Sequence, residues 1–336
     1  MGGHGMSAED RTDDGHRLRV GVLLPTREAA INGDHGVAPL LDFAREAERL
    51  GYDSVWTGDS LLARPRLDPV VVLAAAAAVT SRVTLGTAAY TAALRHPLLG
   101  AHQLASLDRA AEGRLVAALG AGFPVPETER EFAAVGVPYT GRFGRLDDTV
   151  RLWRETWRGS AEAESGKGRE PAGPHRPPSP SSPAGPPLWL AGSDTPRVLA
   201  RTAERYDGWL PFLPDASGYA RAWDRIGQLT AAQGRPPGAV TPGLYATVAI
   251  DPDRAAARKQ LDAYAQAYYG RSLEQMATFQ AFGYGSAQEC AEWLGGYVLA
   301  GARHIILRIG SLDPAAQRAQ LAEAARVLVP ALRAGT

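Results

Sequence analysis

The chain contains a single cysteine, Cys290, which excludes an internal disulfide and fits a reducing compartment such as the cytoplasm. The chain also has no excess of positive or negative charge, because it contains 36 basic and 36 acidic residues and neither kind is clustered in the sequence. A nucleic-acid-binding surface normally shows a clustered excess of basic residues. No run approaches the roughly 18 consecutive apolar residues of a membrane-spanning helix. We therefore expect a cytoplasmic protein that binds neither nucleic acid nor membrane.

Histidine is present, but not in a metal-binding pattern. The seven histidines, at positions 4, 16, 35, 96, 102, 175 and 304, lack the spacing of metal ligands, so we expect no metal site. Met1–Arg17 is polar and rich in glycine, without the hydrophobic core of a secretion signal. We expect these residues to form a disordered tail before a single domain over residues 18–333.

Strand and helix patterns alternate through nearly the whole chain, which is typical of βα units and a parallel sheet. A doubly wound open sheet would need a glycine-rich turn after an early strand. Leu23–Arg27 contains no glycine, and Gly120–Gly122 lacks a third glycine and a following helix. The alternation therefore predicts a (β/α)8 barrel. The expected strands are 18–24, 54–57, 83–87, 115–119, 188–191, 208–211, 244–250 and 304–308.

The expected helices have apolar residues at helical spacing. Residues 159–187 instead are rich in proline, glycine, serine and charge, with almost no large apolar side chain. Such a composition predicts a mobile insertion loop. The expected helices are 39–50, 69–79, 98–109, 142–158, 195–205, 218–233, 251–268 and 314–332, with an additional helical stretch at 286–300.

The segment between residues 85 and 122 has two adjacent strand ends, each followed by small residues. Its order and spacing resemble those of the bacterial luciferase-like monooxygenase family, whose members are flavin- or deazaflavin-dependent barrels. The resemblance covers roughly residues 18–333. The matching pieces are Gly86-Thr87-Ala88-Ala89, His96-Pro97, Leu107-Asp108, Gly113-Arg114 and Gly120-x-Gly122, then Leu50–Trp56, Ala191-Gly192-Ser193 and Asp207-Gly208-Trp209.

The resemblance implies a cofactor site at the C-terminal ends of the strands. It implies a cis peptide bond between Ala88 and Ala89 that supports the flavin or deazaflavin ring, next to Thr87. Gly120, Ala121 and Gly122 would approach the ring from the next strand, although luciferases carry an arginine in place of Ala121. The cofactor phosphate would lie at a helix N-terminus, formed by Gly192, Ser193, Asp194 and Thr195. An ordinary helix cap by Ser193 or Asp194 would give the same pattern.

Ser60 departs from the family pattern, because it occupies the place of a histidine that polarises or deprotonates the substrate in several members. Serine is a weak base near neutral pH without help. Either the chemistry needs no protein base, or Asp59, His35 or Arg64 substitutes. We expect Asp59 to matter more than Ser60. The candidate substrate-binding residues near strand ends and loops are Arg27, Arg64, Tyr90, Phe212 and Tyr284.

The resemblance implies a two-component monooxygenase that uses reduced FMN and oxygen on a small organic substrate. A separate flavin reductase would supply the reduced FMN, because the chain shows no nicotinamide site of its own. One alternative is hydride transfer with a deazaflavin coenzyme of the F-420 type. Another is a non-catalytic flavin-binding relative, which Ser60 would suit. We also expect a homodimer that forms through the helices at 69–79 and 98–109.

Overall fold

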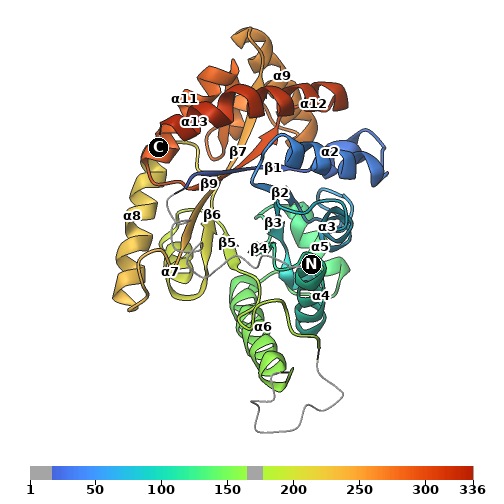
Figure 1. Ribbon diagram of the computed structural model, residues 1–336, viewed down its shortest axis with the longest axis vertical. Coiled ribbons are helices and arrows are strands. Elements are labelled where there is room, and N and C mark those ends of the chain that lie inside the picture. Colours follow the sequence, from blue (N-terminus) through green and yellow to red (C-terminus); the bar gives the residue numbers. More distant parts are fainter. Residues whose placement is uncertain (1–16, 165–176, 336) are drawn as a thin grey trace, which may run out of the picture.

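The computed structural model describes residues 17–164 and 177–335 (Figure 1). Residues 1–16 of the expected tail at 1–17 lie outside these residues, as does the centre of the expected insertion loop, at 165–176. Parallel strands close into a barrel in the order β1-β2-β3-β4-β5-β6-β7-β9, and helices surround it. The predicted (β/α)8 barrel is confirmed. The strands are β1 (Arg19–Leu23), β2 (Ser54–Thr57), β3 (Thr84–Tyr90), β4 (Leu115–Leu119), β5 (Leu188–Ala191), β6 (Gly208–Leu210), β7 (Thr241–Ile250), β8 (Ala281–Gly285) and β9 (His304–Ile309).

Strand β8 is an additional strand that the sequence pattern did not predict. It pairs with the C-terminal half of β7, from Ala246 to Ile250, whereas β6 pairs only with Thr241 and Pro242 at the start of β7. The backbone N–H of Ala281 donates to the carbonyl of Phe212, just after β6. Strand β8 therefore continues the barrel wall where the short β6 has ended.

Two tryptophan rings fill the interior of the barrel. Trp56 on β2 and Trp189 on β5 are buried, with ring centroids 5.5 Å apart. Glycines make room for them, because a Cβ at Gly86 would overlap the Trp56 ring and a Cβ at Gly208 would overlap the Trp189 ring. The barrel is therefore a packed core that supports a site above it, and not a channel.

Helices cover the outside of the barrel, and several begin at a side-chain cap. Asp68, Asp253 and Asp313 accept hydrogen bonds from amides in the first turn of their helices, and these amides have no partner within the helix.

Helices α1, α5 and α10 were not predicted. No helix in the described part of the chain is long and apolar enough to cross a membrane. The helices are α1 (Thr26–Ile31), α2 (Ala38–Arg49), α3 (Pro69–Ala77), η2 (Ala92–Leu94), α4 (Pro97–Ala110), α5 (Pro126–Ala134), α6 (Arg142–Glu164), α7 (Pro196–Arg205), α8 (Ala216–Ala232), α9 (Arg254–Tyr269), α10 (Leu273–Met276), α11 (Ala287–Leu299), α12 (Pro314–Glu323), η3 (Ala324–Leu328) and α13 (Val329–Ala334).

The expected insertion loop at 159–187 is structured at both of its ends. Helix α6 continues through Glu164, beyond its expected end. On the other side, Arg109 Nη2 donates to Ser179 Oγ at 2.7 Å, and the N–H of Ser181 donates to Asp108 Oδ2 at 2.8 Å. Polar contacts with the end of α4 therefore hold this part of the segment. The prediction of a mobile loop rested on the low apolar content, which does not reveal such contacts.

Candidate active site

A cavity of about 790 Å³ lies at the C-terminal ends of the barrel strands. This is the end at which (β/α)8 enzymes hold their substrates, and the volume is in the usual range for small-molecule sites. Most of the predicted site residues line it. They are Asp59, Ser60, Arg64, Ala88, Ala89, Gly120, Ala121, Gly122, Gly192, Ser193, Asp194, Thr195 and Phe212.

Small residues form one wall of the cavity, at the end of β3. The peptide bond between Ala88 and Ala89 is cis, as the family resemblance implied. The pairing of β3 with β4 shifts register between Ala88 and Tyr90, so the strand bulges at this point. A Cβ at the adjacent Gly120 would lie 3.3 Å from the Ala89 Cβ. The alanine platform, Ala88 and Ala89, therefore leaves space that a planar ring can occupy.

The start of α7 offers backbone amides to the cavity and not a capping side chain. Ser193 and Asp194 were the expected caps, but the N-cap is Thr195, and its side chain makes no capping hydrogen bond. Pro196 occupies the first helical turn, as expected. An uncapped helix N-terminus attracts anions. Residues 192–195 therefore fit a cofactor phosphate, and the alanine platform fits its ring.

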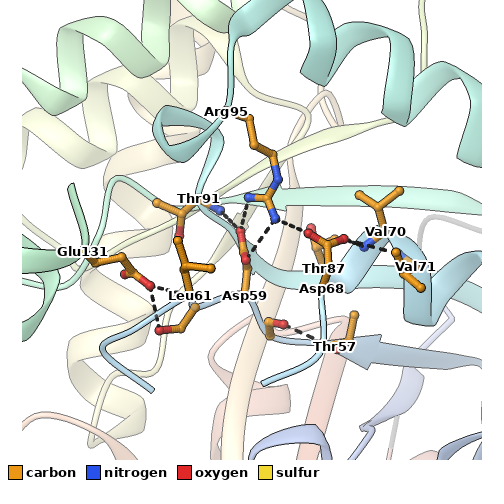
Figure 2. Close-up of polar contacts among 12 residues, drawn as sticks. Thr57, Asp59, Leu61, Asp68, Val70, Val71, Thr87, Thr91, Arg95 and Glu131 are labelled. Carbon is orange, nitrogen blue, oxygen red and sulfur yellow. Dashed lines mark hydrogen bonds and ion pairs between the residues drawn. The ribbon is translucent and has the colours of Figure 1, made fainter. Parts of the chain in front are cut away.

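Asp59 lies in an ion-pair network directly after β2 (Figure 2). Its carboxylate accepts hydrogen bonds from Arg95 Nη1 at 2.6 Å and from the N–H of Thr91 at 2.9 Å. Arg95 Nη2 also donates to Asp68 Oδ2 at 2.7 Å. Burial raises the pKa of the Asp59 carboxyl, and the hydrogen bonds from Arg95 and Thr91 offset part of that rise. The carboxylate is therefore already occupied and holds the loop after β2 in place.

Ser60 is held by a carboxylate that the sequence analysis missed. Its Oγ donates to Glu131 Oε1 at 3.1 Å and accepts from the N–H of Arg64 at 2.7 Å. The same Glu131 oxygen accepts from the N–H group of Leu61 (Figure 2). It also accepts from the N–H group of Leu62. Glu131 lies on α5, a short and highly charged helix whose weak apolar pattern did not reveal it. The Glu131 side chain thus fixes the first turn of the loop after Asp59.

Thr87 and Tyr90 on β3 do not line the cavity. Thr87 Oγ1 donates to the Ala118 carbonyl at 2.8 Å, within the barrel wall. Tyr90 is fully buried, with its ring beside Trp153 and under the guanidinium of Arg95. The bulge at Ala88–Ala89 changes the alternation of inward and outward residues, which simple strand periodicity did not anticipate.

His35, Arg27 and Tyr284 also lie outside the cavity lining. His35 is exposed in the loop after α1. Arg27 donates to the Pro65 carbonyl at 3.2 Å, and Tyr284 lies under the guanidinium of Arg254, 4.7 Å from its ring centroid. The structure therefore gives none of these three side chains a place beside the alanine platform.

Several polar side chains that line the cavity were missed. They include Arg308 on β9, Tyr245 on β7, Arg66 in the loop after β2, and Tyr268 and Tyr269 at the end of α9. Arg308 had a visible signal, because it is a charged residue near the end of an otherwise apolar strand. Tyr268 and Tyr269 had no such signal, since they end a helix whose contact with the site depends on the fold. Among the described residues, no group of three or more His, Cys, Asp or Glu could hold a metal ion.

Comparison with known proteins identifies related chains. A family model for luciferase-like monooxygenases matches residues 18–304. An F420-dependent glucose-6-phosphate dehydrogenase from Kineococcus radiotolerans is 39% identical over 127 residues. That match covers 35% of this chain and 36% of the dehydrogenase, so the chain aligns with only about a third of its relative.

Two solved structures share the fold while using different cofactors. An F420-dependent secondary alcohol dehydrogenase in complex with an F420–acetone adduct has a TM-score of 0.70 at 18% identity, over 94% of this chain and 99% of that chain. The oxygenating constituent of 3,6-diketocamphane monooxygenase from Pseudomonas putida, in complex with FMN, has a TM-score of 0.72 at 16% identity. It covers 94% of this chain and 98% of that chain. At these identities the likeness is one of fold.

Proposed function

This chain belongs to the luciferase-like monooxygenase family, a family of oxidoreductases, and from that premise we propose that it is a monooxygenase that binds reduced FMN. The ring would lie against Ala88 and Ala89, and the phosphate would lie at residues 192–195. When bound, reduced FMN would supply oxygen activation and the transfer of one oxygen atom to a small organic substrate. A separate flavin reductase would be the source of the reduced cofactor.

The observation that carries this proposal is that the two buried carboxylates of the cavity already accept hydrogen bonds from other groups of the protein. Asp59 accepts from Arg95 and Thr91, and Glu131 accepts from the loop after β2. No histidine lines the cavity among the described residues. Oxidation of an alcohol by hydride transfer needs a group that takes the hydroxyl proton. Oxygen transfer from the reduced cofactor has less need of one, so the residues of this chain would mainly bind, orient and exclude water.

The second candidate is hydride transfer with a deazaflavin on the same platform. The 39% identity to an F420-dependent dehydrogenase, over about a third of each chain, favours it. The two candidates differ in their need for oxygen, because deazaflavins do not support oxygen activation. Both place the ring against Ala88 and Ala89.

We also infer that the protein forms a homodimer through α3 and α4, which lie side by side (Figure 1). The ion pair between Arg95 and Asp68 joins the starts of these helices. Val71, Leu98 and Leu99 on their first turns are 62%, 46% and 50% exposed. A second copy of the chain would cover this apolar surface.

The deciding experiment is a titration of the purified protein with reduced FMN and with reduced deazaflavin, in air and without oxygen. We expect FMN to bind and to support oxygen-dependent turnover. Tight binding of the deazaflavin alone, with anaerobic turnover, would establish the second candidate. Ala89→Leu should weaken binding about tenfold or more, because the added atoms overpack the platform. Ala110→Leu, an equal change at an exposed position of α4, should bind as the unmodified protein does.

A further inference from the structure

We propose that the end of the cavity beside β7 and β9 binds an oxyanion of the substrate, such as a phosphate, sulfonate or carboxylate group. Arg308, Arg66 and Arg64 would hold it. This inference rests on the proposed function only in naming the ligand a substrate. The site itself consists of side chains that the cofactor site does not use.

Arg308 is a buried cation at the top of the barrel core. It is 2% exposed, yet it lines the cavity. Its hydrogen bonds from Nε and Nη2 go to a single neutral acceptor, Thr247 Oγ1, at 3.1 and 2.7 Å. Four tyrosine rings surround the guanidinium, with centroids 4.6 to 5.4 Å from Cζ; they are Tyr245, Tyr264, Tyr268 and Tyr269.

Two of these tyrosines connect Arg308 to the other two arginines. The Tyr268 ring lies 4.6 Å from Arg308 Cζ and 5.9 Å from Arg66 Cζ, and its hydroxyl accepts from Arg66 Nη2 at 3.0 Å. The Tyr269 ring lies 5.2 Å from Arg308 Cζ and 5.0 Å from Arg64 Cζ. All five side chains line the cavity. The two rings thus hold three guanidinium groups around one part of it.

The charge of this cluster is not balanced by the protein. Among the described residues, no carboxylate oxygen lies within 4.0 Å of a guanidinium nitrogen of Arg64, Arg66 or Arg308. The nearby carboxylate is that of Glu28, which is buried and accepts a hydrogen bond from the Tyr264 hydroxyl. Arg308 is buried and Arg64 and Arg66 are half-buried, yet in the described part of the chain none of the three guanidinium groups is directly paired with a carboxylate. Buried charges are costly unless they are paired, and a bound oxyanion would supply the missing partner.

The oxyanion site is separate from the proposed phosphate site of the cofactor. Residues 192–195 follow β5, whereas Arg308 is on β9, and β6 and β7 lie between these strands in the closed barrel. Arg64 and Arg66 follow β2, next to the β3 end that carries the alanine platform. A ring on that platform would therefore have its phosphate toward β5 and the oxyanion of the substrate toward β9. A substrate anchored there would present a neighbouring carbon to the ring.

The test is a calorimetric titration of the full chain, saturated with FMN, with inorganic phosphate, sulfate and acetate at constant ionic strength. FMN occupies the cofactor phosphate site, so added anions report the second site. We expect phosphate and sulfate to bind more tightly than acetate, since three guanidinium groups suit a multiply charged oxyanion. Acetate as the tightest ligand would contradict the expected joint action of three guanidinium groups on a multiply charged oxyanion, and would assign a carboxylate group to the site.

Variants test whether anion binding depends on these three arginines or only on the overall positive charge of the protein. Arg64→Gln should weaken phosphate binding about tenfold, because it removes a charge-assisted contact. Arg308→Lys keeps the buried charge, so it should weaken phosphate binding less than Arg308→Gln does. The matched control is Arg254→Gln, which also removes an arginine stacked on a tyrosine ring but lies outside the cavity. It should leave phosphate affinity unchanged.

The outcomes distinguish this inference from the proposed function. If FMN binds and no anion does, or if Arg64→Gln and Arg254→Gln bind phosphate equally, the oxyanion site is refuted while the flavin proposal stands. If FMN does not bind but phosphate still binds and loses affinity in Arg64→Gln, the arginine site is established and the flavin proposal fails.

Discussion

Asp59 and Arg95 form a two-point ion pair at the end of β2, with Arg95 Nη1 2.6 Å from Asp59 Oδ2 and Nη2 3.2 Å from Oδ1. The two side chains are 5% and 14% exposed, so solvent screens them little. Removing one partner of a buried pair leaves the other charge uncompensated, at a typical cost of about 3–5 kcal/mol. Asp68 still contacts Arg95 and reduces this cost.

We therefore expect Asp59→Asn to lower the free energy of unfolding by about 2–3 kcal/mol and to weaken flavin binding, because the loop after β2 lines the cavity. Urea unfolding and a fluorescence titration with FMN would measure both effects. The control is Asp42→Asn, which removes an exposed carboxylate paired with Arg45 and should cost less than about 1 kcal/mol. Equal stability of the two variants would refute a structural role for the ion pair.

Ser60 and Glu131 lead to a second prediction about the same loop. Ser60→Ala removes one of the donors to Glu131 Oε1 but leaves the N–H groups of Leu61 and Leu62. Turnover should fall about tenfold or less, the equivalent of about 1.4 kcal/mol in the barrier. Glu131→Gln should have the larger effect, since it removes the charge that all three donors share. Kinetics of both variants with the same substrate would test the order, and a larger loss in Ser60→Ala would reverse the roles.

Gly86 and Trp56 lead to a third prediction, about the core of the barrel. A Cβ at Gly86 would overlap the buried Trp56 ring, so Gly86→Ala should destabilise the fold by about 1–3 kcal/mol. Gly227→Ala is the matched control, because Gly227 is an exposed position of α8 where an added Cβ would meet no atom of another part of the chain within 4 Å. It should stabilise the protein by about 0.5–1 kcal/mol. Thermal unfolding of both variants measures the difference, and a neutral Gly86→Ala would contradict the packing described here.

The fold was largely predictable because barrel strands and outer helices differ in apolar periodicity. The eight closed strands were all anticipated within a few residues, for example at Ser54–Thr57 and Leu115–Leu119. Strand β8 was not, because Ala281–Gly285 is short and contains two glycines. The short helices α1 and α5 were missed for a similar reason. They have only six and nine residues, and the stability of such short helices comes mainly from contacts with distant residues.

The part of the site that consists of backbone and small residues was predictable. Ala88, Gly120 and residues 192–195 are small residues at strand ends, and the barrel rule places them in one cavity. The charged groups were less predictable, because their roles depend on partners far along the chain. Asp59 is paired with Arg95, and Tyr268 reaches Arg308 from the end of α9. No local pattern encodes such contacts.

The exposed leucines of α4 allow a test of the proposed homodimer. Leu99→Glu introduces a charge at a position that is 50% exposed, in the first helical turn, where a carboxylate favours the helix dipole. The variant should fold normally but dissociate into monomers at micromolar concentration. Leu299→Glu, at an 86% exposed position on α11, is the control and should remain dimeric. Light scattering distinguishes the two results, and a monomeric unmodified protein would refute the dimer itself.

His304 in the barrel interior should make stability depend on pH. It is 2% exposed, and its Nε2 lies 2.7 Å from Ser54 Oγ. The indole N–H of Trp56 donates to the same Oγ at 2.7 Å, which leaves the serine proton free to point at His304. The imidazole is then a neutral acceptor, in agreement with burial, which lowers the pKa of His304 to about 3.

An unfolded histidine has a pKa of about 6.5, so between about pH 6.5 and pH 3 the unfolded chain binds a proton that the folded chain does not. The free energy of unfolding should therefore decrease as the pH falls through this window, with a contribution from His304 of up to about 1.4 kcal/mol per pH unit. His304→Gln keeps a neutral hydrogen-bonding group and should remove that contribution, even if it lowers stability at pH 7. His102→Gln, at an exposed position on α4, is the control. Urea unfolding of the three proteins at pH 7, 6, 5 and 4.5 would give the slopes, and equal slopes for His304→Gln and the unmodified protein would show that the histidine is already protonated in the core.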